Sequence, residues 1–177
     1  NGLEVCTVTG KQIAPRLTTD NYGGVYIVWQ DERFSPAPEI DIFTQHINGD
    51  GIISFEADGL PICTLDKTQS LPIVRPDGIT GAFVLWQDFR TGSIGIYVQR
   101  VLPDVGIMFE DQGLLLYFGI DGNSINVQSV YLGNDQNLVY WEDNRFSANN
   151  PAIYAVLVDE NYEDTFETLG SIPTIPL

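Results

Sequence analysis

One short pattern occurs three times in the chain: a run of apolar residues ending in Trp, then a polar residue, Asp, any residue and Arg. The copies occupy residues 25–33, 82–90 and 137–145. They hold all three tryptophans of the protein, which stand 57 and 55 residues apart. A fixed period of this size is typical of repeat architectures. The chain is therefore predicted to fold from three similar units.

The unit boundaries follow from the period. Units are predicted over residues 1–57, 58–110 and 111–166, and each opens with or close to Gly-Leu. Residues 167–177 are proline-punctuated and are predicted to form an extended tail or linker outside the repeat.

Each unit carries signals for about four antiparallel strands and none for a helix. The Trp run is almost entirely apolar and rich in β-branched and aromatic residues, which predicts a central strand buried on both faces. The segments at 40–47, 94–101 and 152–158 alternate in polarity, which predicts half-exposed strands. A short edge strand, such as residues 52–55, is expected to close the unit. The predicted fold class is all-β, with three four-stranded antiparallel units.

The unit resembles a repeat found in large secreted and cell-surface bacterial proteins, where it is taken as a β-propeller blade. The residues that carry the likeness are Gly-Leu-x-x-Cys-Thr, then Val-Trp-Gln-Asp-x-Arg, then Asp-Ile-Tyr-x-Gln-Arg. Unit three departs from the pattern, with Tyr117 in place of Cys, as suits a terminal repeat. The resemblance implies a propeller-type, non-enzymatic surface module, secreted or on the cell surface. Three blades are too few to close a ring, so a β-trefoil remains the alternative fold.

The charge balance limits the class of partner. The chain has 24 acidic and 8 basic residues, a net charge of −16. Nucleic acids and anionic membranes need clustered Lys and Arg, so neither is an expected partner. An acidic surface favours solubility and could attract divalent cations such as Ca²⁺.

The Asp and Arg of the repeated pattern are the leading candidates for a site. Their i, i+2 spacing places both side chains on one face of a strand or of its exit. In one interpretation they form a bidentate, partly buried bridge that ties each blade to its neighbour or to the following loop. In the other, the arginines capture a carboxylate, sulfate or acidic glycan. The residues are Asp31 and Arg33, Asp88 and Arg90, and Asp143 and Arg145.

Other candidates are weaker. The loop at 48–51 resembles a calcium loop, but the first and twelfth positions of an EF-hand would fall on His46 and Ala57, so a hairpin turn is predicted. Looser calcium binding by Asp41, Asp50 or Asp58 stays open. His46, the only histidine, is predicted to be exposed, and no triad or zinc pattern accompanies it. Tyr22, Phe34 and Phe146 could stack on carbohydrate.

The two cysteines, Cys6 and Cys63, occupy the same position in units one and two. Equivalent positions in successive repeats are usually too far apart for a disulfide, so both are predicted to be buried free thiols.

These observations favour a non-catalytic binding or scaffolding module of a larger extracellular assembly. The alternatives are a glycan-acting hydrolase fragment with a sialidase-like propeller, and a structural subunit of a fibre or coat. No cofactor is expected apart from Ca²⁺. The apolar faces of the terminal blades should be covered by further blades of a longer polypeptide, a second copy or another subunit.

Overall fold

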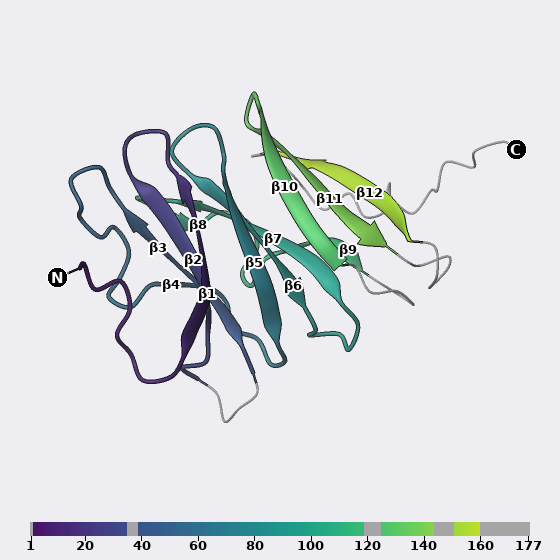
Figure 1. Ribbon diagram of the computed structural model, residues 1–177, viewed down its shortest axis with the longest axis horizontal. Helices are drawn as coiled ribbons and strands as arrows, with labels where there is room; N and C mark the ends of the chain where they lie inside the picture. The colour runs from purple at the N-terminus through teal and green to yellow at the C-terminus, as the bar shows by residue number, and fades with distance from the viewer. Residues whose placement is uncertain (1, 35–38, 119–124, 144–150, 160–177) are drawn as a thin grey trace, which may run out of the picture.

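A computed structural model describes residues 2–34, 39–118, 125–143 and 151–159 (Figure 1). The described residues form strands, turns and loops, with no helix among them. The strands belong to three antiparallel sheets, which lie side by side in chain order (Figure 1). The prediction of an all-β fold without helices is confirmed for this part of the chain.

The three sheets contain four, five and three strands. Sheet A has the order β1 (Gln12–Thr19), β2 (Val25–Asp31), β3 (Asp41–Ile47), β4 (Leu60–Cys63). Sheet B has the order β5 (Gln69–Pro76), β6 (Ala82–Asp88), β7 (Gly95–Leu102), β8 (Gly106–Ile107), and β9 (Leu114–Phe118) also pairs with β7. Sheet C consists of β10 (Ile125–Gly133), β11 (Gln136–Asp143) and β12 (Ala152–Val158).

The outer strand of a sheet comes from the opening residues of the next unit. Strand β4, which opens unit two, pairs with β3 of sheet A, and β9, which opens unit three, pairs with β7 of sheet B. The edge strand expected at residues 52–55 is wrong, since only an isolated bridge between Ile53 and Ile47 occurs there. Sheets and sequence units are therefore offset from each other by one strand.

The three tryptophans occupy equivalent positions on the second strand of their sheets. Trp29, Trp86 and Trp141 lie opposite Phe43, Tyr97 and Tyr154 in identical antiparallel registers. Each indole stacks on the facing ring, with centroids 6.3, 6.0 and 6.2 Å apart. This equivalence confirms the register read from the sequence.

Apolar side chains from facing sheets form two cores. Tyr26, Val28 and Ile42 of sheet A pack with Val74 and Val84 of sheet B. A second cluster joins the opposite face of sheet B to sheet C. It contains Phe83, Leu85, Ile96 and Val98 from sheet B and Val127, Val139, Trp141 and Val158 from sheet C. Sheet B is therefore covered on both faces, whereas sheets A and C each turn one face outward.

The expectation of half-exposed strands at 40–47 and 94–101 is wrong. Strands β3 and β7 are buried along nearly their whole length. Their polar residues do not point to water but find partners inside: the hydroxyl of Thr44, for example, donates to the Ile27 carbonyl over 2.9 Å. In these two strands, the side chains that alternate in polarity are buried on both sides of the strand.

Candidate functional site

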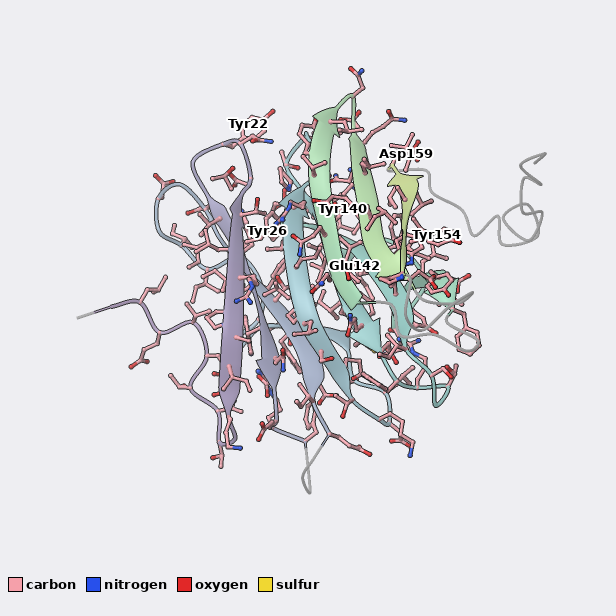
Figure 2. The ribbon with its side chains drawn as sticks, turned by 45° about the vertical axis from the view of Figure 1, so that its right-hand side comes forward. Tyr22, Tyr26, Tyr140, Glu142, Tyr154 and Asp159 are labelled. Atoms are coloured by element: carbon pink, nitrogen blue, oxygen red, sulfur yellow. The ribbon has the colours of Figure 1, made fainter. Side chains whose placement is uncertain are left out.

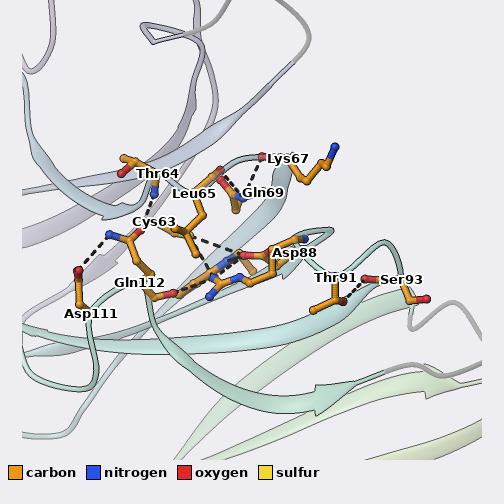
Figure 3. A network of polar contacts seen from close by, with 12 residues as sticks. Cys63, Thr64, Leu65, Lys67, Gln69, Asp88, Thr91, Ser93, Asp111 and Gln112 are labelled. Atoms are coloured by element: carbon orange, nitrogen blue, oxygen red, sulfur yellow. Dashed lines mark hydrogen bonds and ion pairs between the residues drawn. The ribbon is translucent and has the colours of Figure 1, made fainter.

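The Asp–Arg pairs form compact clusters, and that of unit two is drawn in Figure 3. Asp88, fully buried, accepts hydrogen bonds through Oδ2 from Trp86 Nε1 at 3.0 Å and from Arg90 Nη2 at 2.6 Å. Its Oδ1 accepts from the Arg90 backbone N–H at 2.8 Å. The carboxylate thus receives both side-chain donors and closes the turn at the end of β6. Charge-assisted bonds of this kind are among the stronger ones in proteins.

Unit one repeats the cluster with one more bond. Asp31 Oδ2 accepts from Trp29 Nε1 and Arg33 Nη2, both at 2.7 Å. Its Oδ1 accepts from Arg33 Nε and from the Arg33 backbone N–H, both at 2.9 Å. Burial raises the pKa of the Asp31 carboxyl, but the hydrogen bonds from Arg33 and Trp29 lower it by more. The pKa of Asp31 is therefore below its ordinary value. Asp31 therefore stays ionised in the folded protein down to acidic pH.

Unit three retains the part of the cluster that lies in the described residues. Trp141 Nε1 donates to Asp143 Oδ2 at 3.3 Å, and Asp143 is buried. Arg145 and Phe146 lie outside the described residues.

Each arginine also ties the outer strand into the cluster. Arg33 Nη2 donates to the Asp58 carbonyl at 2.7 Å and lies 3.2 Å from the Cys6 sulfur. Arg90 Nη2 does the same with the Gln112 carbonyl at 2.8 Å and the Cys63 sulfur at 3.2 Å. The two guanidinium carbons lie 3.8 and 3.9 Å from the ring centroids of Phe43 and Tyr97. Both guanidinium groups are thereby committed to internal partners, which favours the interpretation as bridges over that of an anion-capturing array.

Two of the tryptophan rings pack closely against a glycine that precedes the outer strand. Gly59 and Gly113 have φ of +97° and +87°, and a Cβ on either would collide with the ring of Trp29 or Trp86. Only glycine combines that backbone conformation with such close approach. Trp, Asp, Arg and Gly together therefore fix where the outer strand begins.

A second polar cluster was missed from the sequence. Asp20 Oδ1 accepts from the backbone N–H groups of Tyr22 and Gly24, and Oδ2 lies 2.9 Å from His46 Nε2. His46 is 2% exposed, so the prediction of an exposed histidine is wrong. Burial raises the pKa of Asp20, but the bonds from His46, Tyr22 and Gly24 lower it more.

Unit two has the same arrangement with arginine in place of histidine. Asp77 Oδ1 accepts from the N–H groups of Ile79 and Gly81, and Oδ2 accepts from Arg100 Nε and Nη2 at 2.9 and 2.7 Å. The signal available in the sequence is an Asp followed four residues later by Gly, together with a basic residue at the matching strand position.

A third repeated device is a buried glutamine. Gln99 Oε1 accepts from the backbone N–H of Arg100 and Phe109, and its Nε2 donates to the Glu110 carbonyl. Gln45 makes the matching three bonds with His46, Phe55 and Glu56. Both side chains are fully buried. Each holds the Phe-Glu turn that leads into the outer strand.

The calcium candidates do not converge. Among the described residues no group of three or more His, Cys, Asp or Glu side chains is placed to hold a metal ion. Asp50 lies in an exposed hairpin turn, and Asp58 Oδ1 accepts the Thr7 N–H at 2.8 Å. Burial, with the nearby Asp31 and Glu39 carboxylates, raises the pKa of Asp41 to about 6. The three carboxylates are therefore not grouped into one metal site.

The cysteines occupy the equivalent positions predicted, each beside an arginine. Both are free thiols, Cys63 fully buried and Cys6 half-buried. Burial raises the pKa of Cys63 to about 12 and that of Cys6 above its usual value. Since the thiolate is the nucleophilic form, neither sulfur is activated for covalent chemistry.

Two aromatic side chains proposed for carbohydrate stacking are exposed. Tyr22 is 70% and Phe34 66% exposed, although the Phe34 ring also lies 6.1 Å from that of Phe43. They lie at different turns, after β1 and after β2 respectively.

Two comparisons with known proteins found no match. No protein-family model matches the sequence, and no curated protein matches it either. Within the described part of the chain no helix is long and apolar enough to cross a membrane.

Proposed function

We propose that the chain is a non-catalytic scaffolding module of propeller type, secreted or displayed on the cell surface. It works by joining its outward sheet faces to neighbouring protein in a larger assembly. The proposal is supported by what the charged groups do: both described arginines of the repeated pattern are bound internally, and both thiols are held protonated. The polar groups of these clusters bind the segments that lead into β4 and β9, and Arg90 also contacts Cys63 of the neighbouring sheet.

The observation that carries the proposal is a change in exposure at equivalent positions. Val74 of β5 is fully buried under sheet A, whereas Leu17, at the same position of β1, is 68% exposed. At the other end of the stack, Leu85 of sheet B is fully buried, whereas Tyr140 of sheet C is 37% exposed. The terminal sheets thus present to water the positions that the internal interfaces cover.

The outward face of sheet C also has apolar residues at two positions where sheet B has charged ones. The positions of the Asp77–Arg100 pair of sheet B carry Leu132 and Leu157, which are 54% and 48% exposed. Figure 2, with sheet C turned toward the viewer, labels Tyr140 on this same sheet. The outward face of sheet C is defined here by Val130, Leu132, Leu138, Tyr140, Ile153 and Leu157. An exposed apolar group of this kind usually marks an interaction surface.

The test is the mass of the native particle, by light scattering or native mass spectrometry. The single chain has a mass of 19.6 kDa, and the expected particle is larger. Placing a charge on either outward face, by Leu17→Glu or Tyr140→Glu, should shift the particle toward the single-chain mass. Val105 is 67% exposed in a turn away from both faces, so Val105→Glu is the matched control and should leave the mass unchanged. A stable monomer of the unaltered protein would refute the proposal.

A further inference from the structure

The outer edge of β12 differs from the equivalent edges of the other two sheets. In sheets A and B that edge pairs with a strand from the following unit, β4 on β3 and β9 on β7. Within the described residues, β12 pairs only with β11. Sheet C therefore has an acceptor edge for which the described part of the chain supplies no donor strand.

The sequence after β12 contains the signal that precedes both donor strands. Phe-Glu-x-x-Gly occurs at residues 55–59 and 109–113, directly before β4 and β9. It occurs a third time at 166–170. The spacing to the preceding strand is also the same. Ile47, Val101 and Val158 each pair with the first residue of the repeated Trp pattern, and the Phe follows eight residues later in all three cases. In the sequence, the spacing of the repeat therefore continues as far as residue 170. The tail or linker predicted over residues 167–177 lies outside the described residues.

The two described copies show what this signal does. Gly59 and Gly113 rest on the rings of Trp29 and Trp86, and β4 and β9 begin at the next residue. In sheet C, Trp141 occupies the same register position as those tryptophans, is 5% exposed, and donates to Asp143 as they do to Asp31 and Asp88. Sheet C therefore has a buried Trp–Asp arrangement of the same construction as those that Gly59 and Gly113 contact in sheets A and B.

We propose that residues 166–175 dock on sheet C as its fourth strand, with Gly170 against Trp141 and residues 171–175 antiparallel to β12. The register follows from the other sheets. Leu60 lies opposite Thr44, and Leu114 lies opposite Val98. The equivalent pair in sheet C is Ser171 opposite Ala155.

One difference makes this strand the weakest of the three outer strands. Gln45 and Gln99 each hold the Phe-Glu turn by two hydrogen bonds, and the equivalent residue of β12 is Val156. A valine cannot replace these bonds, each worth about 1 kcal/mol in net terms. The tail should therefore undock more readily than β4 or β9. The open edge would then resemble an exposed strand that accepts a further chain.

The test is a disulfide placed in the expected register. Ala155→Cys with Ser171→Cys joins residues that would be about 4.5–5.5 Å apart at Cα, within reach of a disulfide. Ala155→Cys with Pro176→Cys is the matched control, because a freely moving tail would close both loops at nearly the same rate. Both variants keep Cys6 and Cys63, and the product is mapped by peptide mass spectrometry under non-reducing conditions.

The expected result is an intramolecular 155–171 bond that forms at least about tenfold faster than the 155–176 bond. Equal rates, or no bond in either variant, would overturn the proposal. An intermolecular product joining the thiol introduced at position 155 to the N-terminal segment of another copy would also overturn it. That segment, residues 2–6, has the same Gly-Leu-x-x-Cys pattern as residues 59–63, which include β4, and is the competing donor.

A second measurement does not depend on introduced cysteines. Truncation after Thr165 should speed amide hydrogen exchange in β12 about a hundredfold, since outward amides would lose their partners. Exchange in β7, whose edge is covered by β9, should be unchanged. Unchanged exchange in β12 would contradict the docking. Neither experiment depends on the particle mass, so this inference and the proposed function fail separately.

Discussion

Replacing Asp88 by Asn tests the view that the Asp–Arg–Trp clusters stabilise the fold by holding the outer strand on its sheet. Asp88 is fully buried and accepts from Trp86 Nε1 and from the side chain and backbone of Arg90. Asn has nearly the same shape as Asp, but one carboxylate oxygen is replaced by an NH₂ group, which cannot accept the hydrogen bonds that this oxygen accepts. The negative charge that pairs with Arg90 is also lost. Breaking a buried ion pair by removing one partner costs about 3–5 kcal/mol. The free energy of unfolding should fall by about this amount.

The assay is equilibrium unfolding in urea followed by tryptophan fluorescence. With a slope of about 2 kcal/mol per molar urea, the midpoint should fall by about 1.5–2.5 M. Glu32→Gln is the matched control, because Glu32 forms an ion pair with Lys11 over 3.0 Å and the Lys11 side chain is 73% exposed. Exposed pairs contribute at most about 1 kcal/mol, so its midpoint should move by less than about 0.5 M. If Asp88→Asn shifts the midpoint no more than Glu32→Gln, the Asp88 cluster does not stabilise the fold as argued.

Three further results are expected. Gly113→Ala should lose more stability than Gly92→Ala in the same urea assay; both have positive φ, but only at Gly113 would a Cβ meet a ring, that of Trp86. Gln99→Val should destabilise by about 2–4 kcal/mol, since three buried hydrogen bonds are lost, and an unchanged midpoint would contradict this. Asp41, with its pKa raised to about 6, binds a proton more tightly folded than unfolded, so its contribution favours folding at low pH and is lost as pH rises from about 4 to 6. Asp41→Asn should therefore be progressively more stable than the unaltered protein over that interval, and parallel stability curves would refute the assignment.

The repeated pattern allowed much of the fold to be predicted. The Trp strands could be read as central because their apolar runs have no polar face, and the shared register of the tryptophans followed from the spacing. The pairing of Asp with Arg was also accessible, since i, i+2 spacing puts both on one side. The bond from the indole N–H to that Asp is equally local, but only Arg was considered as a partner of the Asp. The contact of Gly59 with Trp29 could not be predicted, because it joins residues 30 positions apart that show no local pattern.

The misjudged residues share one physical cause. The alternating pattern predicts an exposed His46, because polar residues on such a strand usually face water. In this stack the second face is covered as well, and its polar side chains are satisfied by partners such as Asp20 and Ser54. The edge strand was misplaced because β4 and β9 belong in sequence to the following unit. The sequence of the unit whose sheet they complete contains no signal for them.

The donated outer strand has a consequence for synthesis. As the chain grows from its N-terminus, β1, β2 and β3 are available once Ile47 has been made, but β4 ends only at Cys63. Sheet A therefore waits for the first residues of unit two, and sheet B waits in turn for β9 of unit three. Until then the edge of β3, and later that of β7, stays open to pairing with another nascent chain. On a crowded polysome the interval between a sheet and its last strand is where mispairing between copies would begin.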